Sequence, residues 1–239
     1  MDLTDGTLLG GRLVYRQPRD GYRTGLAPVL LAASVPARPG ERVVEAGTGA
    51  GAGLLCLLSR VAGLTGIGLE RDGAMAQLAR DNFDANGFAG AAVLQTEIAT
   101  WQPDAAFDHA FANPPWHDQA GTASPMAARE GAKRAAPGLI AAWAAALAKS
   151  LRPRGTLSFI LPAAALAEAS LALEAAKCPE ITLVPLWPRE GVAAKMMIIR
   201  GVRLGRGPCA VHPGLILHAG HQTFTAAAQA VLESGADLT

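Results

Sequence analysis

The sequence Asn113-Pro114-Pro115-Trp116 combines residue types that could hold an amino group in place for chemistry. The two prolines fix φ and remove two backbone donors, and a residue that precedes proline is pushed to an extended conformation. We therefore expect a stiff loop with two acceptors, the Asn113 side-chain oxygen and the Pro114 carbonyl oxygen. Such acceptors would hold the hydrogens of a conjugated amino group and favour a localised lone pair, so that positioning does most of the catalysis. Trp116 could stack on a planar target such as a flipped base.

A glycine-rich segment, Glu45-Ala46-Gly47-Thr48-Gly49-Ala50-Gly51-Ala52-Gly53, comes earlier in the chain, after a short apolar run. Glycines let the backbone turn sharply and approach a ligand, and the free N–H groups that begin a following helix form a positive end. Glu70 ends the next apolar run, 23 residues after Gly47. A carboxylate at such a place can accept hydrogen bonds from both hydroxyls of a ribose. Together the two features predict a nucleotide-like ligand.

The glycine segment alone leaves the identity of that ligand open, because Gly47, Gly49 and Ala52 also satisfy the dinucleotide pattern G-x-G-x-x-A. The carboxylate of Glu45 favours S-adenosylmethionine over NAD, since it could neutralise the ammonium of a methionine moiety and would repel a pyrophosphate. The loop at Asn113 favours the same cofactor. Glu97 follows the third apolar run and could accept from the adenine amino group, although a solvated surface acid is an equally open interpretation.

The elements that must position these residues follow from the alternation of apolar runs with helical patterns after residue 41. Strands are predicted at 42–46, 65–69, 91–95, 107–112, 155–161, 181–185 and 195–202, and helices at 54–61, 74–85, 138–150 and 163–176. This alternation predicts an α/β fold with a mostly parallel sheet, helices on both faces, and an antiparallel pair formed by the last two strands. Ligands in such sheets bind beyond the carboxyl ends of the strands, which is where every motif above lies.

Composition and length limit the class of protein. Of the 239 residues, 50% are hydrophobic and 17% are charged, which excludes a disordered chain and permits a sizeable core. We expect an N-terminal extension over 1–40 with a helix near 26–34, a central domain over 41–206 and a C-terminal extension over 207–239. No segment is typical of a signal peptide or a bilayer span. Three widely spaced cysteines argue against a zinc site or a disulfide framework, so we expect a reduced, cytoplasmic setting and no metal.

The net charge of +1 does not by itself indicate a nucleic-acid partner. Basic residues nevertheless gather in two segments, 1–40 and 189–206, where they could meet phosphates. They are Arg12, Arg16, Arg19 and Arg23 in the first segment and Arg189, Lys195, Arg200, Arg203 and Arg206 in the second. Solvated surface arginines are the alternative interpretation.

The segment from Glu45 to Gly51 and the loop from Asn113 to Trp116 resemble those of the class I methyltransferases. In that family an acidic-x-Gly-x-Gly-x-Gly loop binds S-adenosylmethionine and an Asn-Pro-Pro-aromatic loop binds the target nitrogen. The resemblance implies a Rossmann-like fold with a seven-stranded sheet, and Asn113, Pro114, Pro115 and Trp116 as the catalytic loop. Trp116 departs from the usual Tyr or Phe, and Glu97 stands near the place of an acid that is usually Asp.

A narrower resemblance extends across most of the chain. Gly10-Gly11-Arg12-Leu13, Gln17-Pro18, Gly21-Tyr22-Arg23-Thr24-Gly25, Leu30-Leu31-Ala32-Ala33 and Leu186-Trp187-Pro188-Arg189 are similar to segments of the tRNA1(Val) adenine-N6-methyltransferase family. Members of that family methylate an adenine beside the anticodon, and by resemblance the N-terminal segment closes over the cofactor. The implied cofactor-binding residues are Gln17, Tyr22, Arg23, Gly25, Glu45, Ala46, Gly47, Thr48, Gly49, Gly51, Glu70, Arg71, Glu97 and Asn113.

The leading hypothesis is therefore an S-adenosylmethionine-dependent methyltransferase that acts on the exocyclic N6 of an adenine in tRNA, with RNA as its partner and no membrane association. A protein glutamine-N5 methyltransferase and an RNA guanine-N2 methyltransferase use the same geometry and stay open. An NAD-dependent dehydrogenase and a non-catalytic cofactor-binding or RNA-binding module are the alternatives from other classes. The sequence does not indicate an oligomeric state.

Overall fold

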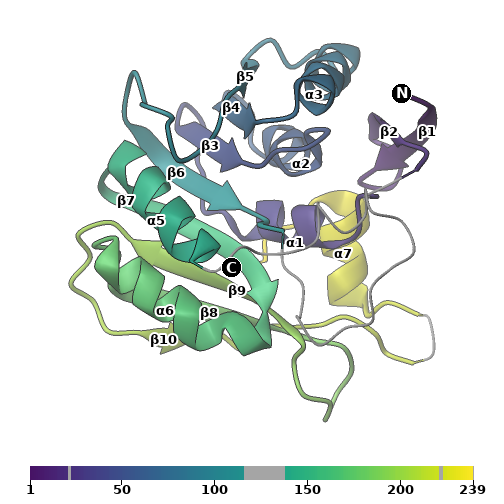
Figure 1. The fold of residues 1–239 in the computed structure, drawn as a ribbon. Helices are drawn as coiled ribbons and strands as arrows, with labels where there is room; N and C mark the ends of the chain where they lie inside the picture. The colour runs from purple at the N-terminus through teal and green to yellow at the C-terminus, as the bar shows by residue number, and fades with distance from the viewer. Residues whose placement is uncertain (21–22, 116–137, 221–222, 239) are drawn as a thin grey trace.

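The computed structural model describes residues 1–20, 23–115, 138–220 and 223–238, and its centre is one large β-sheet (Figure 1). The strands of this sheet are β3 (Arg42–Ala46), β4 (Thr65–Glu70), β5 (Ala91–Gln95), β6 (Phe107–Ala112), β7 (Leu151–Pro162), β8 (Glu180–Trp187), β9 (Met196–Val202), β10 (Ala210–Val211) and β11 (Leu215–Ile216). Their order across the sheet is β10-β8-β9-β7-β6-β3-β4-β5, and β11 also pairs with β8.

The sheet is mostly parallel, as the alternation of strands and helices predicts. β3 pairs in parallel with both β4 and β6, and β6 pairs in parallel with β7. β9 is inserted between β7 and β8 and runs antiparallel to both, which confirms the expected late antiparallel pair. The sheet has nine strands where seven were predicted, because two short segments after residue 206 join it beside β8.

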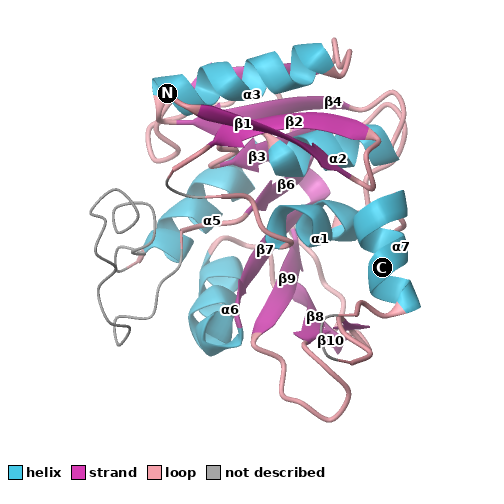
Figure 2. Cartoon of the chain, turned by 90° about the vertical axis from the view of Figure 1, so that its right-hand side faces the viewer, coloured by secondary structure: helices cyan, strands magenta, loops and turns pink. Residues whose placement is uncertain are grey.

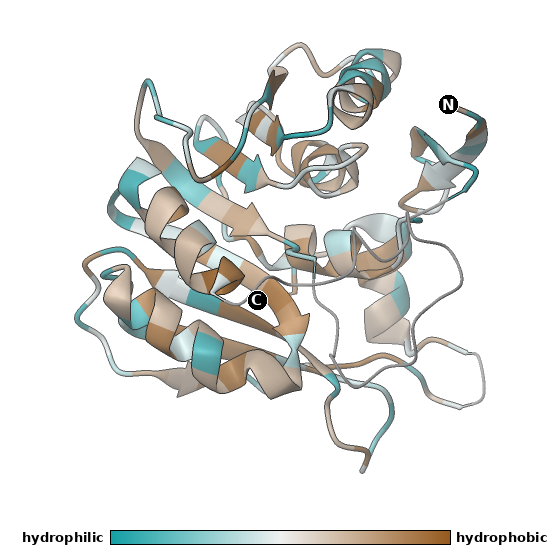
Figure 3. Ribbon diagram, in the orientation of Figure 1, coloured by the Kyte–Doolittle hydropathy of each residue, from teal (hydrophilic) through white to brown (hydrophobic). Residues whose placement is uncertain are grey.

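Helices cover both faces of the sheet, and alternate residues of β3 show which helices lie on which face (Figure 1). Val43 packs in one apolar cluster with α1 (Ala27–Ser34), α2 (Ala52–Arg60) and α3 (Gly73–Ala85). Val44 packs in a second cluster with α5 (Leu139–Ser150) and α6 (Leu166–Ala175). The central strands are mostly apolar, but β3 also contains Arg42 and Glu45 and β6 contains Asp108 and His109, so hydrophilic colour appears on them too (Figure 3). Burial on two faces explains why apolar residues predominate in these strands.

The segment over residues 1–40 contains structure that the sequence did not indicate. β1 (Leu3–Leu8) and β2 (Leu13–Pro18) form a separate two-stranded antiparallel sheet that lies alongside α3 (Figure 2). At the other end of the chain, α7 (Ala226–Ser234) packs against α1, and the Leu238 amide donates to the Ala33 carbonyl. Within the described ranges, no helix has both the length and the apolar character needed to cross a membrane.

Two predicted boundaries differ from the structure near β7. The strand was predicted from residue 155 and begins at Leu151, directly after α5, with an irregularity in its pairing with β6 near Phe107. Gly155 lies within this longer strand, where a Cβ would stand 2.8 Å from the Asp108 carbonyl oxygen. The helix predicted at 163–176 is a short 3-10 turn, Ala163–Ala165, followed by α6.

Candidate functional site

The register of the sheet brings the sequence motifs to one edge. Ala46, the last residue of β3, pairs with Leu69 of β4 on one side and with Ala112 of β6 on the other. The next residue along each strand is therefore at the same level of the sheet. These residues are Gly47 of the glycine loop, Glu70, and Asn113. Three predicted parts of the site thus meet at the carboxyl ends of neighbouring parallel strands, where ligands bind in such folds.

The glycine loop needs its glycines for two physical reasons. Gly47, Gly49 and Gly51 have φ values of 65°, 57° and 88°, a region that side chains with a Cβ rarely adopt. A Cβ on Gly47 would also stand 2.8 Å from Cη2 of Trp143. The position of Gly49 is open by comparison, since among the described residues a Cβ there would meet only the Met75 side chain, at 3.9 Å. The loop is therefore packed against Trp143 at Gly47 and accessible at Gly49.

Glu70 is held at the mouth of the loop. Its Oε2 accepts from the Gly49 amide at 2.9 Å, and its Oε1 accepts from the Asp72 amide at 2.9 Å. Each carboxylate oxygen can accept a further hydrogen bond, so Glu70 keeps capacity for two hydroxyl groups. A carboxylate that can accept from two more hydroxyl groups fits the two hydroxyls of a ribose, which supports the predicted nucleoside-containing cofactor. Arg71, the next residue, is exposed.

Glu45 lies beneath the loop rather than at its surface. Only 3% of the residue is exposed, and its Oε2 accepts from Thr48 Oγ1 at 2.5 Å and from the Leu54 amide at 3.0 Å. Burial raises the pKa of Glu45 to about 7, against the opposing effect of these two hydrogen bonds. Because the N-cap of α2 is Gly51, Glu45 supplies an acceptor that the cap residue lacks. Its contact with a methionine ammonium stays a prediction.

The Asn-Pro-Pro loop continues directly from a fully buried strand. All residues of β6 are buried, and the chain then places Asn113 half-buried, Pro114 buried and Pro115 half-buried at the carboxyl edge. Trp116 lies outside the described residues. The three described residues are therefore adjacent to the glycine loop through β3, as the predicted catalytic role requires.

The remaining predicted cofactor residues lie at two places. Gln17 is the penultimate residue of β2, and its Oε1 accepts from the Thr24 amide at 3.0 Å. Arg23 and Gly25 are exposed. Tyr22 lies outside the described residues. Glu97 is exposed in the turn after β5, where its carbonyl oxygen accepts from the Thr100 and Trp101 amides.

Two residues of the site were missed by sequence reasoning. Trp143 lies half-buried on α5 with its ring edge against Gly47, and a single tryptophan in an alanine-rich helix gives no signal for this contact. Asn82 is 2% exposed on α3 and donates from Nδ2 to the Ala50 carbonyl of the glycine loop at 2.9 Å. A buried asparagine at mid-helix is an unusual residue that could have drawn attention, because its amide needs partners.

The basic residues of segments 1–40 and 189–206 have different environments in the structure. Three of their arginines are fastened to the protein's own backbone. Arg12, Arg200 and Arg203 donate from Nη1 to the carbonyls of Ser234, Ser34 and Ala176 at 2.6, 2.9 and 3.2 Å. Arg189 and Lys195 are exposed and flank the turn between β8 and β9. That turn lies at the same edge as Asn113, because β8 runs antiparallel to β9 and β9 antiparallel to β7.

Comparison with known proteins gives a family match over the centre of the chain. Residues 25–161 match the family model described as "Methyltransferase small domain". A tRNA1(Val) (adenine(37)-N6)-methyltransferase of Cronobacter sakazakii is 32% identical over 119 residues, which are 48% of this chain and 48% of the relative. An enzyme of the same name from Actinobacillus succinogenes is 32% identical over 149 residues, which are 61% of this chain and 63% of the relative. The chain thus matches about half to three-fifths of the length of these curated relatives.

Solved structures share the fold. A predicted O-methyltransferase of Agrobacterium tumefaciens superposes with a TM-score of 0.74 at 23% identity, over 89% of this chain and 98% of that chain. A T. thermophilus 16S rRNA N2 G1207 methyltransferase, solved with AdoMet and guanosine, superposes with a TM-score of 0.59 at 19% identity, over 84% of this chain and 50% of that chain. At these identities the likeness concerns the architecture alone.

Proposed function

We propose that this chain, which belongs to the methyltransferase small domain family and has a Rossmann-like fold, is an S-adenosylmethionine-dependent methyltransferase that methylates the exocyclic N6 of an adenine in tRNA. The observation that carries the proposal is the common register of Ala46 with Leu69 and Ala112, which sets Asn113 beside the glycine loop and Glu70. The names of the two curated relatives support the choice of adenine and tRNA. We propose that the enzyme acts on RNA in the cytoplasm.

The proposed residue roles follow from the geometry at the sheet edge. When bound, S-adenosylmethionine supplies an electrophilic methyl group. Glu70 would hold the ribose hydroxyls, and the accessible backbone around Gly49 would lie against the cofactor. The side-chain oxygen of Asn113 and the carbonyl oxygen of Pro114 would accept both hydrogens of the target amino group, so that its lone pair is directed at the methyl group. No general base is needed, because the methylated nitrogen can release its extra proton to water.

The RNA would approach the carboxyl edge, where Arg189 and Lys195 of the β8–β9 turn are exposed. We propose that Arg189 and Lys195 contact phosphates, which fix the RNA without reading its sequence. Trp116 is proposed to stack on the flipped adenine, as its place after Pro115 in the sequence suggests.

The proposal is tested by incubating the protein with tritiated S-adenosylmethionine and, separately, with unmodified tRNA, ribosomal RNA and cell protein. We expect label in tRNA, recovered as N6-methyladenosine. Asn113→Ala is expected to lower the rate by about a hundredfold or more while cofactor binding is retained, because a positioned polar group at the reacting centre is lost. Gln229→Ala, an exposed amide on α7, is the control and should keep full activity.

The other outcomes reassign the substrate or reject the mechanism. Label recovered as methylguanosine or in protein glutamine would keep the methyltransferase and replace adenine as its target. Full activity of Asn113→Ala on the true substrate would show that the Asn-Pro-Pro loop does not hold the target nitrogen.

A further inference from the structure

Asn82 of α3 and Asn86, the C-cap residue that follows this helix, form hydrogen bonds to both backbone groups of two residues on β2. Asn86 accepts from the Val14 amide at 3.0 Å and donates to the Val14 carbonyl at 2.8 Å. Asn82 accepts from the Arg16 amide and donates to the Arg16 carbonyl, both at 2.9 Å. Each side-chain amide thus makes the two hydrogen bonds that a residue of a neighbouring strand would make.

The spacing of the two asparagines matches the spacing of their partners. Four residues of α-helix rise about 6 Å, and two residues of antiparallel strand rise about 6.8 Å. Asn82 and Asn86 therefore line up with Arg16 and Val14, respectively, the alternate residues whose backbone groups point away from β1. A shift of the hairpin by one residue would turn these groups away from α3, so the pair of asparagines fixes the register of the hairpin on the helix.

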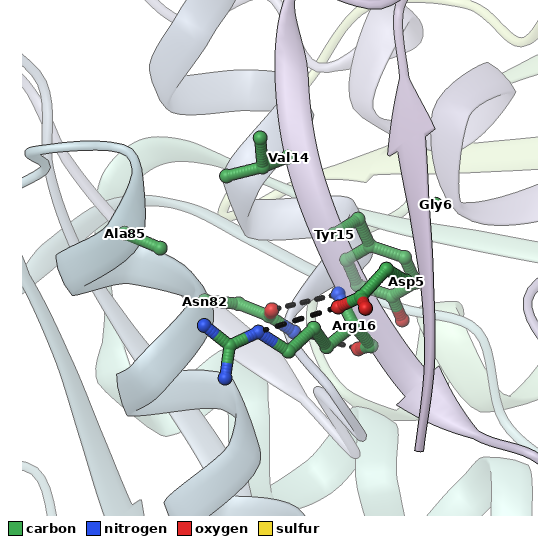
Figure 4. A pocket seen from close by; sticks show the side chains of 7 residues that line it. All are labelled: Asp5, Gly6, Val14, Tyr15, Arg16, Asn82 and Ala85. Carbon is green, nitrogen blue, oxygen red and sulfur yellow. Dashed lines mark hydrogen bonds and ion pairs between the residues drawn. The ribbon is translucent and has the colours of Figure 1, made fainter.

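The hairpin depends on this attachment for its position. A two-stranded sheet is marginally stable alone in water. Leu13 and Tyr15 are buried in the core and hold the hairpin by apolar contact. Between the hairpin and α3, however, the packing is incomplete, and a recess of about 280 Å³ remains (Figure 4). The Arg16–Asp5 ion pair at 3.7 Å is exposed and contributes little.

Asn82 also connects the hairpin to the glycine loop. Its Nδ2 donates to the Arg16 carbonyl and to the Ala50 carbonyl, each at 2.9 Å. Ala50 stands between Gly49 and Gly51, so one nitrogen atom joins β2 to the loop that is proposed to bind the cofactor. The residue is 2% exposed, so water cannot easily replace either bond if the side chain is removed.

Hydrogen bonds from β2 also fix the position of the residues that follow the hairpin. The Gln17 side chain accepts from the Thr24 amide at 3.0 Å, and the Tyr15 hydroxyl and the Thr24 hydroxyl lie 2.7 Å apart. Tyr15, Gln17 and Thr24 therefore form one unit with β2. A displaced hairpin would move Gln17 and Gly25 together with it.

We propose that Asn82 and Asn86 are positioning residues for S-adenosylmethionine, which hold the N-terminal hairpin and the glycine loop in one arrangement so that cofactor affinity depends on docking of the hairpin. The inference rests on the proposed cofactor site at the glycine loop. It does not depend on the identity of the methylated substrate.

The experiment measures the Kd of S-adenosylmethionine by calorimetry on the full chain, without RNA, for Asn82→Ala, Asn86→Ala and the control Gln77→Ala. Gln77 is exposed on the same helix and bonds to Asp81 at 2.9 Å, away from the hairpin. We expect the Kd to rise about fivefold to tenfold for Asn86→Ala, which loses the bonds to the hairpin. The rise should be larger for Asn82→Ala, which loses the bonds to the hairpin and the bond to the glycine loop. Gln77→Ala should bind as the unchanged protein does. Amide hydrogen exchange of β1 and β2 should accelerate in both asparagine variants while exchange in β3 and β6 stays slow.

The outcomes separate this inference from the proposed function. Unchanged cofactor affinity in a folded Asn86→Ala protein whose hairpin amides exchange faster would overturn the inference, because hairpin docking and binding would be uncoupled. A rise in Kd with unchanged hairpin exchange would overturn it as well. If Asn82→Ala fails to fold, the inference is tested by Asn86→Ala alone, since Asn86 is only half-buried at the end of α3. Where tRNA is methylated, Asn86→Ala should raise KM for the cofactor and leave kcat and the KM for tRNA unchanged, a split that general loss of stability would not produce.

Discussion

Replacing Glu45 by glutamine would remove a buried charge and keep the hydrogen bonds that the side chain makes. Thr48 Oγ1 and the Leu54 amide both donate to the same oxygen, Oε2. The amide oxygen of glutamine can take that place, and the amide nitrogen takes the place of the other oxygen. The two side chains have nearly the same shape, so the change isolates the cost of the charge.

The expected magnitude follows from the pKa of Glu45, which burial raises from 4.5 to about 7. The folded protein binds this proton more tightly than the unfolded chain does, so the associated stability is present below pH 4.5 and is lost as the pH rises through about 7. At about 1.4 kcal/mol for each pKa unit, the ionised side chain costs about 3 kcal/mol above pH 7. Glu45→Gln should therefore be more stable than the unchanged protein by about that amount at pH 8, and nearly equal to it at pH 4.5.

The assay is urea unfolding without cofactor at several pH values between 4.5 and 8, followed by cofactor titration of the same samples. Only the difference between the two proteins is used, because other titrating groups are common to both. Glu190→Gln, which removes an exposed charge, is the control and should show no such difference. If Glu45 also meets the methionine ammonium as predicted, affinity for S-adenosylmethionine should rise with pH near 7 in the unchanged protein, and this dependence should be absent from Glu45→Gln.

A lower stability of Glu45→Gln at pH 8 would refute the reasoning. It would mean that the positive end of α2, which begins above Glu45, stabilises the carboxylate by more than burial costs. Equal stability of the two proteins over the whole pH range would refute the raised pKa itself.

Two further substitutions probe the cofactor loop. Glu70→Ala removes the acceptor for the Gly49 amide and the proposed ribose contact, so we expect the Kd of S-adenosylmethionine in calorimetry to rise by roughly tenfold to a hundredfold, as for hydrogen bonds to a charged group; an unchanged Kd would place the ribose elsewhere. Gly47→Ala puts a Cβ 2.8 Å from Trp143 at a φ of 65°, so we expect a loss of about 1–3 kcal/mol in urea unfolding. The double variant with Trp143→Leu should recover part of that loss, and no recovery would count against the steric explanation.

The central strands were predictable because they are buried on both faces. The predicted boundaries of Arg42–Ala46 and Phe107–Ala112 agree with the structure, and so do those of Ala91–Gln95, which is the edge strand and is less buried. The order of motifs along the chain then required the glycine loop, Glu70 and Asn113 to meet at one edge of a parallel sheet. What could be read from the sequence was therefore the set of elements and the edge that carries the site.

The parts that were missed depend on contacts between distant segments. β1 contains Asp5 and Gly6 and has no buried residue, so its sequence has no apolar stripe, and its partner β2 is fixed by asparagines more than sixty residues away. α7 is different, because its sequence did carry signals. Thr225 accepts from the Ala228 amide as an N-cap, and Gly235 ends the helix in a left-handed conformation. These start and stop residues could have located the helix.

The short strands β10 and β11 have a consequence for how the protein behaves in concentrated solution. They occupy Thr182–Leu183 and Leu186–Trp187 on the outer side of β8, and Pro185 between them has no amide hydrogen to offer. The Trp187 indole donates to the Pro213 carbonyl at 3.0 Å and holds the connection between the two short strands in place. A long exposed strand edge is a template on which other chains can add and aggregate. By covering that side of β8 with two-residue strands, the chain leaves a foreign strand little continuous backbone on which to pair.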